Sequence, residues 1–192
     1  ERIEYPVAGF RFEHQQFQEY YAALMVQEKL AELVAEKDAN RREAFNATYI
    51  NEPAWDEPLA LAAEDFGSTG DHATSVESAG VLIDGALRVD PLFAARLARL
   101  CGPAHSQQLR SELGKRLRLL YAADNPHYRQ LAIAAMLATG WDDFIDILIP
   151  LLIHSDQQIR LGTYRAGSDF YPSCLGANWW HVVSGWQERF RG

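Results

Sequence analysis

Cysteine is scarce in this chain, because only Cys101 and Cys174 occur among its 192 residues, and they carry no metal-ligand spacing. Two cysteines cannot form a disulfide framework, so we expect reduced thiols in a cytoplasmic protein. Long apolar runs are also missing: the longest, residues 144–153, contains Asp146 and falls short of the ~20 residues of a membrane helix. No basic and apolar leader follows Glu1, so we expect neither a secretory signal nor a membrane partner.

The motifs of catalysis and nucleotide binding are absent as well. The glycine-containing stretch 67–74 has no lysine after either glycine, which excludes the Walker A pattern Gly-x-x-x-x-Gly-Lys-Ser/Thr. The histidines never occur at the i, i+4 spacing that places two imidazoles on one helix face for zinc. Asp142, Asp143 and Asp146 could gather a divalent cation, although acidic residues are also expected where a helix begins. We therefore expect no enzyme activity, no metal and no cofactor in this chain.

Charge is unevenly distributed along the chain. Residues 1–66 hold 14 acidic and 6 basic side chains, which accounts for the whole net charge of −8, whereas residues 67–192 are balanced at 12 and 12. This shift, together with the Gly/Ser-containing punctuation that begins at Gly67, predicts a boundary between two regions, 1–66 and 67–192. Within the second region, residues 88–129 carry eight basic side chains and three acidic ones.

What the sequence has in abundance is helical periodicity. From Glu13 to Lys37, apolar residues recur every three to four positions, which predicts one helix with a single buried stripe beginning at Phe17. Thr74 and Glu77 have the spacing of a capping box, and Asp90 precedes a proline as an N-cap does. The further helices predicted in this way cover residues 59–63, 92–101, a leucine stripe over 109–120, and then 126–139, 143–153, 157–166 and 178–191. Because no segment alternates with period two, the sequence predicts an all-α chain.

An internal repeat appears in the last third of the chain, where residues 120–129 match residues 151–160. Asn125 and Asp156 each stand four positions before an arginine, Arg129 and Arg160, and the two arginines are 31 residues apart. A leucine-rich helix, a turn with Asp or Asn, and a second helix that opens with Arg resemble the HEAT repeat. Such helix pairs cannot bury their own faces and must stack, so the resemblance implies an α-solenoid of HEAT-like pairs over residues 67–192.

A second resemblance lies near the start of the chain, in the run Phe-Arg-Phe-Glu-His-Gln-Gln-Phe-Gln-Glu-Tyr-Tyr-Ala-Ala over residues 10–23. It is similar to the segment that closes the winged-helix domain of STAND nucleoside triphosphatases of the NACHT and NLR kind. The resemblance implies that residues 1–66 are the end of a winged-helix domain and a helical linker, with the NTPase module upstream. In that family the equivalent of His14 reaches the β-phosphate of ADP, so His14 is the expected cofactor contact, in the intact parent only.

Together these resemblances imply the regulatory and sensor arm of a NACHT-type signalling or defence NTPase. The arm would be a protein-interaction and autoinhibition scaffold without catalysis of its own, while ATP or ADP and Mg²⁺ would bind the upstream module. The expected partners are that module and a protein or other macromolecular trigger.

Two alternatives remain open. One is a HEAT-like nucleic-acid enzyme of the DNA glycosylase type, in which the basic stretch 88–129 would contact the phosphates of the nucleic acid. Arg110, Lys115 and Arg118 do not share one narrow helix face, however, and a net charge of −8 opposes DNA affinity, so a nucleic-acid partner is not expected. The other alternative is a free-standing HEAT adaptor without any NTPase.

Overall fold

The computed structural model describes residues 15–68 and 73–169, and in these ranges the chain is all-α, as the sequence predicts, with nine α-helices and no strand. The helices are α1 (Gln15–Glu36), α2 (Ala39–Phe45), α3 (Asp56–Ser68), α4 (Ala73–Val89), α5 (Pro91–Leu100), α6 (Gly102–Ala122), α7 (Pro126–Thr139), α8 (Ile145–Leu152) and α9 (Gln157–Asp169). Three short segments complete the described part: the π-helical η1 (Asn46–Ile50) and the 3-10 turns η2 (Pro53–Trp55) and η3 (Asp142–Phe144). The predicted helix over 178–191 lies outside the described residues.

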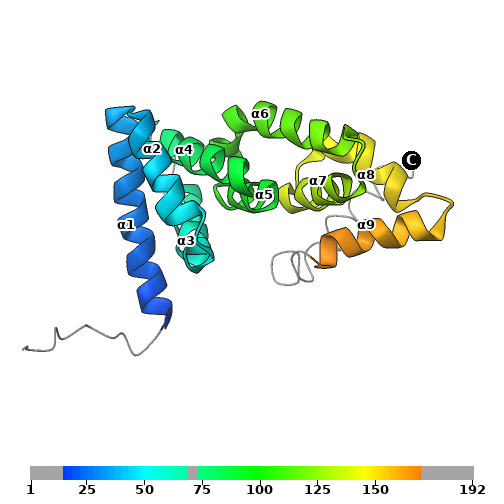
Figure 1. The fold of residues 1–192 in the computed structure, drawn as a ribbon, viewed down its shortest axis with the longest axis horizontal. Coiled ribbons are helices and arrows are strands. Elements are labelled where there is room, and N and C mark those ends of the chain that lie inside the picture. Colours follow the sequence, from blue (N-terminus) through cyan, green and yellow to red (C-terminus); the bar gives the residue numbers. More distant parts are fainter. Residues whose placement is uncertain (1–14, 69–72, 170–192) are drawn as a thin grey trace, which may run out of the picture.

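The helices follow one another along the long axis of the molecule, from α1 at one end to α8 and α9 at the other (Figure 1). Helices that are two positions apart in the chain contact each other. The chain α3, α5, α7 and α9 packs pairwise in this order, and α4 packs against α6. At the first end, α1 packs against both α3 and α4. The predicted boundary near Gly67 therefore falls between α3 and α4, two helices that are both covered by α1.

Most helix ends follow from residues that the sequence displays. The Asp90 Oδ1 accepts hydrogen bonds from the backbone amides of Leu92 and Phe93, at 2.8 and 3.2 Å, in the first turn of α5. Pro91 is the first residue of that helix. At the C-terminal end of α7, Gly140 is left-handed (φ 64°), a conformation that glycine adopts without steric cost. The capping box predicted at Thr74 is wrong, because α4 already begins at Ala73 and Thr74 lies inside its first turn.

The apolar stripe of α1 is only partly buried, which corrects the prediction of one buried stripe from Phe17 onward. Val26, Leu30 and Leu33 are buried, as expected for the face that contacts α3 and α4. In the first half of the helix, by contrast, Phe17 and its apolar neighbours are exposed by 41–56%. Periodicity reports which residues share a face, but whether that face is covered depends on the length of the neighbouring helices.

The core is centred on α7, in which all residues from Ala132 to Thr139 are buried. A helix that is buried all round needs small residues where its neighbours approach closely, and four of these eight positions are alanine. The leucine stripe predicted over 109–120 is confirmed, because Leu113 and Leu117 of α6 are buried and the leucines at its two ends pack against the core. Among the described residues, no helix combines the length and the apolar character that crossing a membrane requires.

The two matching segments of the internal repeat share a capping hydrogen bond, and in each the arginine donates to a carbonyl of the preceding turn, although not to the equivalent one. The Asn125 side chain accepts a hydrogen bond from the His127 amide at 2.9 Å, at the start of α7. The Asp156 side chain accepts one from the Gln158 amide at 2.7 Å, at the start of α9. Arg160 donates to the Ser155 carbonyl at 2.9 Å, and Arg129 donates more weakly to a carbonyl eight residues earlier, at 3.4 Å. The similarity of the two segments is thus a similarity of structure, with a capping side chain and an arginine directed back to the preceding turn.

Replacement of Asp156 by alanine tests this role. Loss of the cap is expected to lower the free energy of unfolding by about 0.5–2 kcal/mol, measured by urea denaturation. Asp124→Ala is the control, because it removes the same charge from the equivalent turn of the first segment, one position before the capping residue. Equal stability of the Asp156 variant and the wild-type chain would contradict a structural role for this carboxylate.

Candidate functional site

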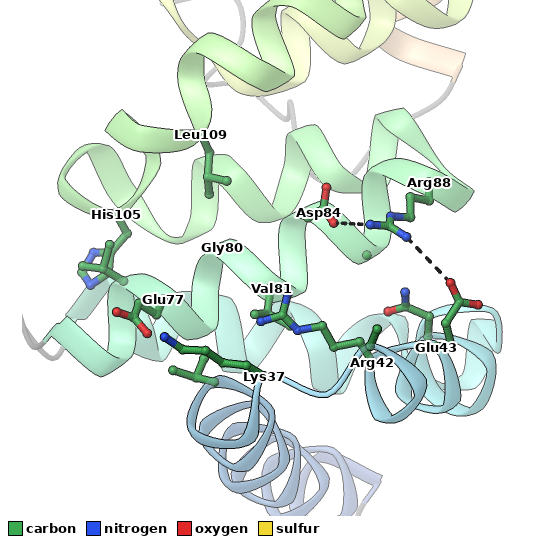
Figure 2. A pocket seen from close by; sticks show the side chains of 15 residues that line it. Lys37, Arg42, Glu43, Glu77, Gly80, Val81, Asp84, Arg88, His105 and Leu109 are labelled. Atoms are coloured by element: carbon green, nitrogen blue, oxygen red, sulfur yellow. Dashed lines mark hydrogen bonds and ion pairs between the residues drawn. The ribbon is translucent and has the colours of Figure 1, made fainter.

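A cavity of about 540 Å³ opens between the end of α1, α2, η1, α4 and the start of α6 (Figure 2). Small-molecule sites commonly enclose about 300–1,000 Å³, so this cavity has the size of a ligand pocket. Lys37 and Arg42 line it from the α1–α2 side, Glu77 from α4, and His105 from α6. Side chains that are far apart in the sequence therefore meet here.

His105 is the most unusual residue of this cavity. Its side chain is 2% exposed, and its Nε2 has no hydrogen-bond partner among the described residues. Buried side-chain nitrogens almost always have a partner, because an unsatisfied polar group loses its hydration without compensation. The nitrogen itself is enclosed by protein atoms and does not open to the cavity, so it is an unsatisfied polar atom of the packed interior.

The charged side chains of the cavity fall into two groups. Arg88 forms an ion pair with Asp84 at 3.0 Å and a longer one with Glu43 at 3.8 Å, both shown in Figure 2. The side chains of the other group, Lys37, Arg42 and Glu77, have no ion pair or hydrogen bond with any residue in the described part of the chain. These three charges are therefore available to a ligand, whereas the Arg88 group is already neutralised within the fold.

The backbone around the cavity is shaped by a helix end and by a glycine. Lys37, just after the end of α1, is left-handed at φ 55°, and its amide donates to the Leu33 carbonyl at 3.1 Å. A left-handed residue at this position is a common way for a helix to end. On the opposite wall, a Cβ added to Gly80 in α4 would meet no atom within 4 Å, so α4 presents open space to the cavity at this position.

Two of the three acidic residues considered as cation ligands, Asp143 and Asp146, are engaged by arginines. Asp146 accepts from Arg118 at 2.8 Å, and this hydrogen bond holds the pKa of the carboxyl group below its usual value. Asp143 forms an ion pair with Arg110 at 3.1 Å. Among the described residues, no group of three or more His, Cys, Asp or Glu side chains could hold a metal ion.

The other sequence-predicted positions lie away from this cavity or outside the described residues. His14 lies outside them, as do Cys174 and residues 69–72 of the Gly/Ser-containing stretch. Gly67, expected in a loop, belongs instead to the last turn of α3. Cys101 is a free, buried thiol whose pKa is raised by burial to about 12, so it is not a candidate nucleophile.

The basic stretch 88–129 is largely matched by carboxylates. Five of its eight basic side chains form ion pairs, and three of these reach back to earlier helices: Arg88 contacts Glu43 at 3.8 Å, Arg96 contacts Glu57 at 3.3 Å, and Arg116 contacts Asp84 at 3.7 Å. Arginines engaged in this way are poorly placed to contact a phosphate backbone. The charge of this stretch therefore serves mainly to connect helices.

Sequence reasoning did not find the cavity. Four of its lining residues, Lys37 after α1, Arg42 in α2, Glu77 in α4 and His105 in α6, come from separate parts of the chain and form no motif. Comparisons of the chain with protein-family models, with curated proteins and with solved structures gave no match.

Proposed function

We propose that this chain is the regulatory and sensor arm of a NACHT-type signalling or defence NTPase, an interaction and autoinhibition scaffold without catalytic activity of its own. The observation that carries the proposal is the exposed apolar face of α1, formed by Phe17, Tyr20, Tyr21 and Leu24. We call it the α1 face. Contiguous apolar surface of this kind marks a site of protein–protein contact.

The α1 face lies in the same segment as the NACHT-like run over residues 10–23. Tyr20 is 54% exposed and Leu24 is 41% exposed, and both continue the stripe that is buried further along the same helix. We therefore propose that the upstream NTPase module of the same protein packs against the α1 face. The module would cover the first half of α1, as α3 and α4 cover the second half. In this proposal residues 1–66 close the winged-helix domain, and His14 contacts the β-phosphate of ADP in the intact parent.

The remaining helices support an α-solenoid of HEAT-like pairs as the sensor surface. Helices two positions apart in the chain pack against each other from α3 to α9. The two repeat segments share a capping side chain, and each has an arginine that donates to a carbonyl of the preceding turn. A stack of this type offers an extended surface to a protein or other macromolecular trigger. ATP or ADP and Mg²⁺ would bind upstream of this chain.

The test compares Leu24→Glu with Leu119→Glu in the full-length protein. Both leucines are exposed, but Leu119 lies on α6 and is 71% exposed, away from the α1 face. If the module packs on this face in the resting state, Leu24→Glu should accelerate release of bound ADP by roughly tenfold, because autoinhibitory couplings are typically of this size. Leu119→Glu should leave the rate unchanged.

Three outcomes would contradict the proposal. The first is a gene whose sequence upstream of Glu1 contains no P-loop, which would favour the free-standing adaptor. The second is equal ADP release from both variants. The third is strong destabilisation of the isolated 192-residue chain by Leu24→Glu with unchanged ADP release, since the α1 face would then belong to the chain's own core.

A further inference from the structure

We propose that residues 175–191 form a third unit of the internal repeat and pack against α8, at the end of the described stack. The third unit rests on the repeat that also supports the proposed α-solenoid, but not on a NACHT-type role or on nucleotide binding upstream. Two observations carry it: burial recurs with a period of 31 residues, and α8 is apolar all round but covered only in part.

Burial recurs in both helices of the two described units, the first from α6 into α7 and the second from η3 into α9. In each unit, two buried residues of the first helix lie four positions apart, as one face of a helix requires. The residues that are buried in both units and separated by 31 positions are Leu113 and Phe144, Leu117 and Leu148, Ala132 and Thr163, and Ala135 and Ala166. The match of residues 120–129 with residues 151–160 is therefore part of a longer period, which describes the burial of the whole unit.

The sequence continues this period past α9. Residues 144, 148 and 152 of the second unit are buried, and 31 positions later stand Leu175, Trp179 and Val183, which are all apolar. Three apolar residues at a spacing of four form one helix face that has to be covered. The sequence thus supplies a third first helix with the same apolar face as the second.

The arginine of the repeat recurs as well, because Arg129, Arg160 and Arg191 are separated by 31 residues each. The two described arginines donate to carbonyls of the preceding turn, so we expect Arg191 to contact the equivalent turn at residues 184–186. The first two residues of this turn are serine and glycine, which are poor helix formers. In the third unit, the helix predicted over 178–191 is therefore divided into two helices with a turn between them.

The apolar surface at the end of the stack belongs to α8, which lies opposite α1 in the molecule (Figure 1). Asp146 is the only charged residue of this helix, and a helix that is apolar all round is normally buried all round. Ile147 and Leu151 are nevertheless only half-buried, and Ile153, directly after the helix, is 64% exposed. We call these three apolar residues the α8 surface.

Residues 175–191 are the cover that the chain itself offers to this surface. α9 contacts α8 and reaches Asp169, and the five residues that follow span at most about 18 Å when extended. The third unit thus begins within reach of the α8 surface, whereas a second copy of the chain would have to associate from solution. If the third unit covers the α8 surface, a trigger of the proposed sensor arm binds elsewhere on the stack.

The first experiment compares Trp179→Ala with Trp186→Ala in the 192-residue chain by urea denaturation. By the 31-residue period, Trp179 corresponds to the fully buried Leu148, whereas Trp186 corresponds to the exposed Ser155. Trp179→Ala should therefore lower the urea midpoint by roughly 1–2 M, and Trp186→Ala should leave it nearly unchanged. A single helix over 178–191 predicts equal losses instead, because residues seven positions apart share one helix face.

The second experiment compares Glu188→Pro with Ser184→Pro. Glu188 corresponds to Pro126, the first residue of α7, where proline is tolerated because the amide needs no partner within the helix. Ser184 corresponds to Ile153, whose amide donates to the Ile149 carbonyl at 3.1 Å. Glu188→Pro should therefore keep the urea midpoint and Ser184→Pro should lower it, whereas in one continuous helix both prolines would be destabilising.

An unchanged urea midpoint for Trp179→Ala overturns the proposal, as do equal losses for the two tryptophan variants or for the two proline variants. A wild-type chain that is dimeric in sedimentation equilibrium, and that Ile153→Glu makes monomeric, would identify a second copy as the cover of the α8 surface and would also overturn it. Because none of these readouts involves ADP or the upstream module, failure here leaves the proposed regulatory function to its own test.

Discussion

Phe144→Ala is expected to lower the free energy of unfolding by about 3–5 kcal/mol, the largest effect of any substitution considered for this chain. Phe144 is fully buried at the end of η3, and its ring lies beside Gly114 of α6. Its ring stacks on Trp141, with centroids 6.4 Å apart and planes 15° apart, and the Arg118 guanidinium lies 5.7 Å from its centroid. Truncation removes these contacts together and leaves a cavity that the surrounding helices can fill only by shifting from their packed positions.

The matched control is Phe17→Ala on the α1 face, where the same side chain is 56% exposed. Surface substitutions typically change stability by less than about 0.5 kcal/mol, so the two variants should differ severalfold in urea denaturation. A loss at Phe144 as small as that at Phe17 would show that η3 does not pack against α6 as described.

Gly67→Ala is expected to destabilise the chain by about 1–3 kcal/mol, although alanine is the better helix former. A Cβ at this position would lie 2.6 Å from the Leu100 carbonyl oxygen and 3.1 Å from the carbonyl carbon of Cys101. These are backbone atoms at the end of α5, which cannot rotate away as a side chain can. The ends of α3 and α5 would have to separate.

Gly80→Ala is the control, because Gly80 is also helical and a Cβ there meets no atom within 4 Å. Relief of the entropic cost of glycine should raise stability by about 0.5–1 kcal/mol. Opposite signs for the two glycine substitutions, measured as shifts of the urea midpoint, are the expected result. A stabilised Gly67→Ala variant would mean that α3 and α5 do not approach each other closely at this point.

The sequence by itself determined the fold class and most helix ends. The predicted helix over 126–139 coincides with α7, and Asp90 acts as the cap that the sequence predicts. The repeat between residues 120–129 and 151–160 also corresponds to shared hydrogen bonds. These features are predictable because they depend on residues within one or two turns of each other, and helical periodicity and capping are local interactions.

Tertiary structure decided what is covered and what is open. The α1 stripe has one periodicity, but only the half that meets α3 and α4 is buried. Gly67 has the composition of a loop and is instead a contact between helices, while Lys37, Arg42, Glu77 and His105 form one cavity without sharing a motif. Burial, close approach and convergence depend on which helix lies opposite each residue, and that is set by packing between segments distant in the chain, which no local pattern records.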